Sequence, residues 1–288
     1  MSYNLASLAT YTDEMSFELI SKAVLQTNLM NYSTIRSGLK AGTTAINLLD
    51  ANIAVADRAC GWDAAGNLTY SQVDIVMSEK QTKQALCPTD LRDYYLAEKL
   101  SGSAYAEEVP FAEVVSNLFV EKIKNYNEGF LATELFSKVT VAAGAADSGQ
   151  TVASTLSTIV DDVMDLIDAV DPAVLDREDL AVFMSPANFN LLRRALTAQN
   201  LYHYVPSDNN TELMIPGTDF KAIKGTFSGP AMVAGPMKDF VIGVGLEDDF
   251  DTLKIFWSQD NDEVRVMSAW RLGAAVVDVT KWAKNGTL

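Results

Sequence analysis

A single histidine is the first place to look for chemistry in this 288-residue sequence. His203 lies between Tyr202 and Tyr204, and no Ser, Cys or carboxylate stands at a recognised catalytic spacing from it. Hydrolase triads and most catalytic metal sites need at least one well-placed histidine. We therefore interpret His203 as a packing or surface residue. We expect no catalytic residue, and we expect that the protein is not an enzyme.

Acidic clusters are the remaining candidates for a metal site. They occur in two predicted loops, with Glu247, Asp248, Asp249 and Asp251 in the first and Asp260, Asp262 and Glu263 in the second. Hard cations such as calcium take six to eight oxygen ligands, but the residue spacing of a calcium-binding loop is absent. We expect two solvated loops and no bound metal or cofactor. A cytosolic α/β enzyme with an acidic metal site at Asp248 or Asp262 stays open as an alternative.

Two further patterns resemble known sites but lack their key residues. Residues 38–44 have the glycines of a phosphate-binding loop, without the lysine that must directly precede the threonine. Cys60 and Cys87 are too few for a zinc site, which usually needs four ligands. We interpret the first pattern as an ordinary turn. We interpret the cysteines as buried thiols, with a disulfide as the less favoured alternative in a cytosol.

The charge balance argues against some classes of partner. The chain has 22 Lys and Arg against 38 Asp and Glu, a net charge of −16, whereas tight nucleic-acid binding depends on cations that neutralise phosphates. No apolar run of about 18 residues is present, so no membrane-spanning helix is expected. The first residues lack a basic region followed by an apolar one, so no secretory signal is expected. We expect a cytosolic protein.

Residues 110–126 carry the clearest structural pattern in the sequence. Pro110 suits the first turn of a helix, and Gly129 favours a stop or break. At about 1.5 Å per residue the helix would be about 25 Å long. Because it carries no catalytic group, we interpret it as a scaffold. Its apolar residues recur at steps of three and four, which places them on one face: Phe111, Val114, Val115, Leu118, Phe119, Ile123 and Tyr126.

The segment before residue 40 predicts an arm. Residues 12–26 carry Met15, Leu19 and Ile20 at helical spacing, with charged residues at the positions between them. One short amphipathic helix cannot bury its apolar stripe alone. It therefore needs another surface, either the core of its own chain or that of a neighbour.

Residues 45–77 switch to a period of two and predict a long β-hairpin, with its turn at residues 61–67. A one-residue slip in the alternation predicts a bulge between Tyr70 and Val73. An isolated two-stranded ribbon is marginal in water, so a projecting one needs a partner surface. Trp62 at the predicted tip would be exposed on a monomer, which suits a contact site.

Beyond residue 142 the pattern becomes α/β. Residues 142–150 are rich in Ala, Gly, Asp and Ser and are the best candidate for a domain boundary. Helices are predicted over residues 152–170 and 186–199, the second with Ser185 as its cap. Strands are predicted over residues 180–184, 220–223, 231–234 and 240–244, followed by a closing hairpin of residues 253–257 and 264–277.

The order of these parts, over essentially the whole chain, resembles the major capsid proteins of tailed bacteriophages, whose Hong Kong 97-type fold is shared with encapsulin shells. Residues 12–42 resemble the N-terminal arm of that family, residues 50–79 its extended hairpin, and residues 110–126 its spine helix. The strand-to-helix junction at residues 184–189 is similar to one in the axial domain. Residues 257–277 resemble the closing strands.

The resemblance implies an α+β protein with the Hong Kong 97-type capsid fold. Its parts would be an N-terminal arm (residues 1–44), an extended β-hairpin or E-loop (45–85), a peripheral domain with a long spine helix (86–142 and 245–288), and an axial α/β domain (143–244). It also implies contacts between subunits. The candidates for these contacts are Trp62, Leu68, Tyr70, Met15, Leu19 and Ile20.

The resemblance implies a structural protein that self-assembles as hexamers and pentamers into an icosahedral shell around phage double-stranded DNA. It implies portal and scaffolding proteins as partners, with cement proteins as an optional addition, and no membrane. The protein would reside in the virion, and in the host cytoplasm during assembly. The acidic balance agrees, because an inner wall that does not grip DNA leaves it mobile. An encapsulin-type compartment stays open as an alternative.

Calorimetry separates the shell protein from the enzyme alternative. Because the acidic loops are expected to be solvated, titration with magnesium, calcium or manganese should show no uptake. Measurable binding of one of these cations would favour the metal-dependent enzyme instead.

Overall fold

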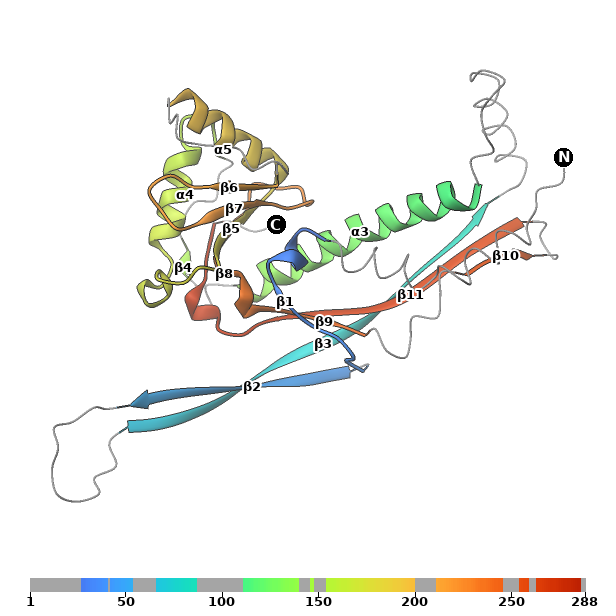
Figure 1. Ribbon diagram of the computed structural model, residues 1–288, viewed down its shortest axis with the longest axis horizontal. Coiled ribbons are helices and arrows are strands. Elements are labelled where there is room, and N and C mark those ends of the chain that lie inside the picture. Colours follow the sequence, from blue (N-terminus) through green and yellow to red (C-terminus); the bar gives the residue numbers. More distant parts are fainter. Residues whose placement is uncertain are drawn as a thin grey trace.

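The computed structural model describes residues 27–40, 42–53, 66–86, 111–139, 146–147, 154–199, 211–245, 254–258 and 263–285. Its strands form two six-stranded sheets. Figure 1 shows an elongated molecule, with the second sheet and its helices gathered at one end and a two-stranded ribbon projecting below them. Among the described residues no helix is long and apolar enough to cross a membrane.

The first sheet is long and is built around one strand. Its order is β1 (Thr34–Arg36), β9 (Phe240–Val244), β11 (Glu263–Val276), β3 (Gly66–Leu86) and β2 (Gly42–Ile53), with β10 (Lys254–Ser258) also paired to β11. Residues 264–272 of β11 pair antiparallel with β3, and residues 272–276 pair antiparallel with β9. β11 therefore joins segments that lie far apart in the chain. The predicted closing hairpin is confirmed as β10 and β11.

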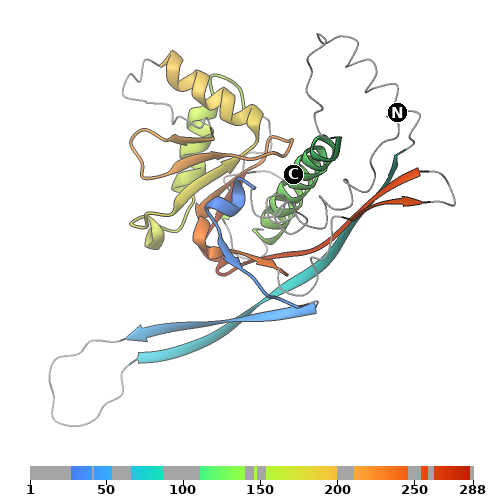
Figure 2. The ribbon, with the colours of Figure 1, turned by 45° about the vertical axis from the view of Figure 1, so that its right-hand side comes forward.

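β2 and β3 form the ribbon, and the predicted long hairpin is confirmed. Their register is constant from the Gly42–Met77 pair to the Ile53–Gly66 pair. The predicted bulge between Tyr70 and Val73 is therefore wrong. In a regular strand, successive side chains point to opposite faces. The one-residue slip in the apolar pattern therefore means that the apolar side chains move from one face of the ribbon to the other. Figure 2 shows this ribbon extending away from the rest of the molecule.

The predicted spine helix is α3 (Phe111–Lys138), and it is much longer than expected, at 28 residues. The expected stop at Gly129 is wrong, because the helix continues through it. The second half carries residues that are fully buried in the core, and their burial outweighs the cost of about 1 kcal/mol for a glycine within a helix. These residues are Leu131, Ala132 and Leu135.

The second sheet has the order β4 (Ala146–Asp147), β12 (Ala283–Asn285), β8 (Met232–Pro236), β5 (Leu180–Met184), β7 (Lys221–Lys224) and β6 (Glu212–Met214). Helices α4 (Ile159–Asp168) and α5 (Pro186–Ala198) pack on it. The strand β5 and the helix α5 appear where they were predicted. The Ser185 hydroxyl caps α5 by accepting a hydrogen bond from the Asn188 amide.

The strand β5 joins two hydrophobic cores because both of its faces are buried. Val182 and Met184 pack in the core with α4 and α5. Phe183 packs on the other side, in a core that contains the buried half of α3 and the fully buried Trp282. The second sheet therefore lies between α4 and α5 on one face and α3 on the other. The short helices η1 (Leu29–Asn31), η3 (Pro172–Val174), η4 (Met237–Asp239) and η5 (Val279–Lys281) complete the described part.

Other sequence expectations have mixed outcomes. The helix predicted over residues 152–170 begins later, at Ile159, after a turn in which the Thr158 hydroxyl contacts Thr155. The strand β6 was not predicted. Residues 12–26, expected to be a helical arm, lie outside the described residues. In the expected linker, residues 146–147 form β4.

Gly129 provides a test of the continuous helix. A methyl group at this position would meet no atom within 4 Å, so Gly129→Ala should raise the free energy of unfolding by about 0.5–1 kcal/mol. Denaturant unfolding of the subunit measures it. Gly42 is the matched control, because it is equally open but has φ +112°, and Gly42→Ala should destabilise the protein. A loss of stability in Gly129→Ala would contradict a continuous α3.

Candidate functional site

The described residues offer no group of three or more His, Cys, Asp or Glu side chains that could hold a metal ion. The sequence candidates for chemistry lie mostly outside this part of the chain. Those outside are His203, Cys60, Cys87, the loop with Asp248, and Asp260 and Asp262. Glu263 is described, at the start of β11, and its carboxylate pairs with Arg265 at 2.7 Å. The remaining candidate for a site is therefore a surface.

The ribbon buries one face where it joins the body of the molecule. Ile46, Ile75 and Met77 pack in a small apolar cluster with Val241 of β9. Val76 stands between two of these residues in the sequence and is 55% exposed on the opposite face. The subunit therefore covers only one of the two faces of its own ribbon here.

Further along the ribbon an exposed aromatic residue lies on the other face. Tyr70 is 76% exposed, and the alternation of side chains along β3 places it on the face of Val76 and not on that of Ile75. The backbone of Leu68 pairs with that of Ala51 in the same register. The uncovered face of the ribbon thus carries two exposed apolar residues, Val76 near the body and Tyr70 further out, with the polar Gln72 and Asp74 between them.

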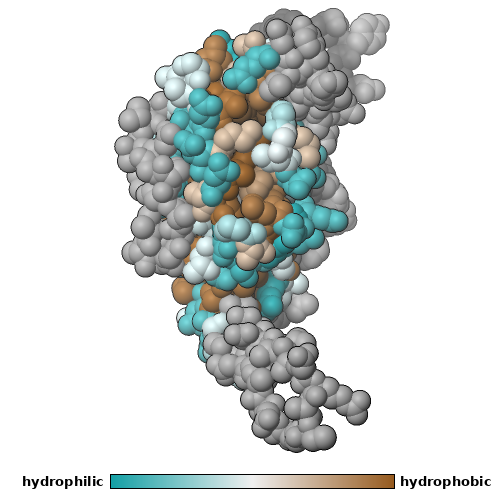
Figure 3. All heavy atoms as spheres, turned by 90° about the vertical axis from the view of Figure 1, so that its left-hand side faces the viewer, coloured by the Kyte–Doolittle hydropathy of each residue, from teal (hydrophilic) through white to brown (hydrophobic). Residues whose placement is uncertain are grey.

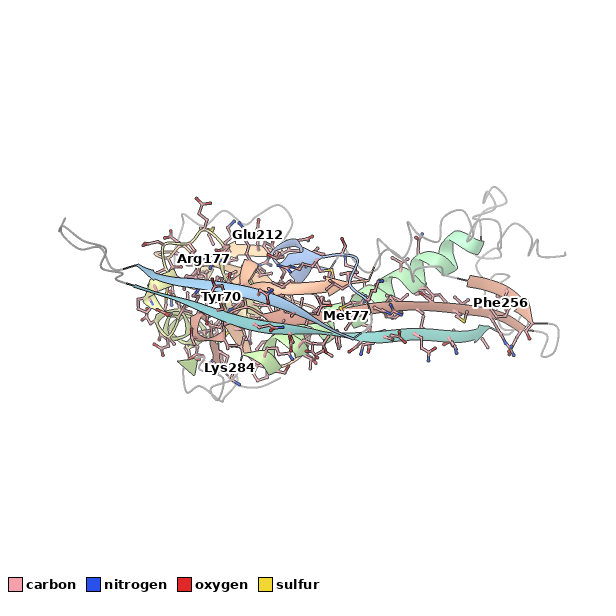
Figure 4. The ribbon with its side chains drawn as sticks, turned by 90° about the horizontal axis from the view of Figure 1, so that it is seen from below. Tyr70, Met77, Arg177, Glu212, Phe256 and Lys284 are labelled. Atoms are coloured by element: carbon pink, nitrogen blue, oxygen red, sulfur yellow. The ribbon has the colours of Figure 1, made fainter. Side chains whose placement is uncertain are left out.

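Figure 4 places two exposed aromatic residues at opposite ends of the first sheet. Tyr70 lies on the projecting ribbon, whereas Phe256 lies on β10 at the far end. Phe256 is 44% exposed. Met77 lies between these ends, where the ribbon meets the body. A sheet with exposed apolar side chains at both ends offers two separate contact surfaces.

A groove of about 510 Å³ runs between α3 and the strands β3 and β11. Leu118 and Tyr126, both predicted to lie on the buried stripe of the helix, are more than half exposed here. At the base of the groove the Trp270 indole N–H donates a 2.9 Å hydrogen bond to the Asn127 side-chain oxygen. Further residues that line the groove are Lys80, Gln84, Phe119 and Lys122. The groove is a second apolar surface, with cations at its rim.

The apolar residues also gather at the end of the molecule from which the ribbon projects. Figure 3 shows them as a band between polar residues on this side, above the ribbon. Leu175 is among the exposed large apolar residues of the second sheet region. A contiguous band of exposed apolar residues is typical of surfaces that contact other proteins.

An ion network near β9 has a structural role. The Arg177 guanidinium contacts Asp179 at 2.8 Å and Asp239 at 2.9 Å, and the Asp179 carboxylate also accepts a hydrogen bond from the Lys238 amide. The hydrogen bond to Asp179 raises the pKa of Arg177. Burial raises the pKa of Asp179, but the hydrogen bonds from Arg177 and Lys238 outweigh it, and the net pKa is lowered. Both groups therefore stay charged at neutral pH, and their ion pairs hold the turn between residues 177 and 179 against residues 238 and 239.

The sequence candidates for contact residues are only partly placed by the structure. Tyr70 is exposed on the ribbon. The backbone of Leu68 lies two positions before it on β3, and its side chain lies outside the described part. Trp62, Met15, Leu19 and Ile20 lie outside the described residues. Sequence reasoning missed Val76 and Phe256, although strict alternation along their strands would have assigned each to one face. The role of the six sequence candidates in contacts between subunits stays a prediction.

Comparison with known proteins finds no matching protein-family model and no matching curated sequence. Solved structures do match. A protein of Gordonia phage Cozz is 11% identical, with 91% of this chain and 86% of that chain covered and a TM-score of 0.59. The capsid structure of the cyanophage P-SCSP1u is 9% identical, with 89% and 86% covered and a TM-score of 0.56. The virus-like particle from Pyrococcus furiosus is 9% identical, with 97% and 98% covered and a TM-score of 0.55.

These likenesses at low identity show the fold. The chain has the mixed α+β, Hong Kong 97-type fold of these capsid structures. The fold predicted from the sequence is confirmed. The predicted division into arm, E-loop, peripheral and axial parts stays a prediction.

The two faces of the ribbon provide a test. Ile75 is fully buried, so Ile75→Ala should lower the free energy of unfolding of the dissociated subunit by about 2–5 kcal/mol. Tyr70 is exposed, so Tyr70→Ser should change it by no more than about 0.5 kcal/mol. Denaturant unfolding of both variants makes the comparison. Equal losses would mean that the subunit covers the Tyr70 face itself.

Proposed function

We propose that this chain is a structural shell protein, the major capsid protein of a tailed phage, which self-assembles as hexamers and pentamers into an icosahedral shell. The carrying observation is the ribbon, on which Tyr70 is 76% exposed in the subunit. A two-stranded ribbon gains stability only when its apolar face is covered. In the proposed shell, neighbouring copies of the same molecule cover this face of the ribbon.

The arrangement of exposed surfaces supports repeated association. Tyr70 and Phe256 lie at opposite ends of one rigid sheet (Figure 4), and the α3 groove lies beside that sheet. Different surfaces at two ends favour head-to-tail contacts, which close into rings when the rotation allows. Contacts along so long a molecule would exceed the roughly 1,600 Å² of a standard interface.

The charge of the chain supports an enclosed cargo of DNA that is not tightly bound. A net charge of −16 repels phosphates, so the shell would hold double-stranded DNA by enclosure and without sequence-specific contacts. The proposal places the protein in the virion, and in the host cytoplasm during assembly. Portal and scaffolding proteins are its proposed partners, with cement proteins as an optional addition. It assigns the protein no enzymatic activity.

An encapsulin-type compartment is the second candidate. The virus-like particle from Pyrococcus furiosus matches over 97% of this chain and 98% of its own, so the likeness to a particle that is not described as a phage extends over nearly the whole of both chains. The two candidates differ in cargo. Nuclease-protected DNA in particles from the native source favours the phage shell, whereas a protein cargo without DNA favours the compartment.

Shortening the ribbon tests the proposal. Ile75 and Met77 belong to the core, so a deletion must spare them. Leu48 pairs with Ser71, and replacing residues 49–70 by Asn-Gly would close the ribbon with a two-residue turn. We expect the full chain to form particles of MDa mass and the shortened variant to remain as single subunits or small oligomers. Electron microscopy and light scattering measure this.

The shortened variant needs a folding control. Its circular dichroism and thermal transition should match those of the dissociated full chain, since both sheets and all three described α-helices are retained. Shells of normal size from the shortened variant would contradict the role of the ribbon. A full chain that stays a monodisperse monomer under all assembly conditions would contradict the proposed function itself.

A further inference from the structure

Residues 27–34 form a strap that fastens both sheets together. The Asn28 side-chain amide donates to the Lys224 carbonyl of β7 at 3.2 Å, and the Tyr32 hydroxyl donates to the Glu212 carboxylate of β6 at 3.1 Å. On the other side, the Thr34 hydroxyl donates to the Lys238 carbonyl at 2.7 Å, and β1 pairs with β9. Leu29 is fully buried in the core that contains α3.

Glu128 connects this strap to α3. Its side chain is on α3, only 1% of the residue is exposed, and one carboxylate oxygen accepts a 3.4 Å hydrogen bond from the Leu29 amide. The Asn28 amide and the Thr27 hydroxyl add further hydrogen bonds to it. The carboxyl group of α3 is therefore in direct contact with the backbone of the strap.

The charge of Glu128 is poorly compensated in this position. Its second carboxylate oxygen has no hydrogen-bond partner among the described residues. Lys124, one turn earlier on α3, is the charged group that acts on it, and the strap contributes the neutral Thr27 and the backbone amides. Burial raises the pKa of Glu128 to about 7, and the hydrogen bonds from Leu29 and Asn28 lower it only in part. A buried carboxylate with an unpartnered oxygen is costly when charged.

We propose that Glu128 is a protonation-controlled clasp, which holds residues 27–31 against α3 when its carboxyl group is neutral and loosens that contact when it is charged. The clasp sits where residues 1–26 join the described part of the chain. It would thus regulate how firmly residues 27–31 are held against α3. The inference does not rest on the proposed shell function, since both partners of the contact belong to one chain.

The direction of the pH dependence follows from proton linkage. With the clasp closed, the carboxyl has a pKa of about 7, whereas in the open, solvated state it returns to its ordinary value of 4.5. Closing therefore takes up a proton between these values. The contact is strongest below the lower value, weakens about tenfold per pH unit as the pH rises, and is constant above about 7.

Hydrogen exchange of the full chain at pH 5 and pH 8 tests the clasp. After correction for the intrinsic exchange rate, the protection factors of the Asn28 and Leu29 amides should fall on the order of 50-fold from pH 5 to pH 8. Glu128→Gln keeps the shape of the side chain but cannot ionise, so its protection should be independent of pH. Glu121→Gln is the matched control, because Glu121 lies exposed on the same helix, and it should behave as the wild type.

Each outcome decides the proposal. A pH-dependent fall that is present in the wild type and in Glu121→Gln, and absent in Glu128→Gln, supports the clasp. Equal protection of these amides at both pH values in the wild type overturns it, whether or not the Glu128→Gln variant folds. A fall of the same size in Glu128→Gln assigns the pH dependence to another group and also overturns it.

Discussion

The pairing of β11 with β3 decides where the ribbon leaves the subunit. β11 holds β3 only as far as the pair of Leu272 with Ser78, and beyond that point β3 pairs with β2. Gly273 stands at this divergence, where a Cβ atom would lie 2.5 Å from the Val76 carbonyl oxygen. The absence of a side chain allows the two backbones to approach closely before they separate. Every exposed surface on the ribbon follows from this separation.

The body of the molecule is rigid because its two sheets share a core. Both faces of β5 are buried, so Phe183 packs toward α3 while Val182 packs toward α4 and α5. The strap of residues 27–34 adds polar contacts across the same junction. A rigid body can place two ends of a long sheet at fixed positions. This property suits a subunit that must meet neighbours at defined angles, and the ribbon alone could not provide it.

The two faces of the ribbon have different roles, since one stabilises the subunit and the other is free for contacts with other molecules. Ile75 contributes to the stability of its own subunit, whereas Tyr70 and Val76 on the other face contribute area that the subunit does not cover. The hydrophobic effect is non-directional, so such area drives association with any complementary apolar surface. The constant register of the ribbon fixes the spacing of the exposed side chains along one face. Only a partner surface with matching spacing can cover them all.

The sequence by itself determined the types of the larger elements, because hydrophobic periodicity is a local property: the hairpin, β5, β9, α5 with its Ser185 cap and the start of α3 all appear as predicted. It could not determine where α3 ends, since burial of Leu131 and Leu135 by distant strands overrides the local signal of Gly129. It also could not find the Glu128 contact, which joins residues 99 positions apart. Which face of a strand is covered, and by what, depends on partners distant in the chain, and only the tertiary structure decides that.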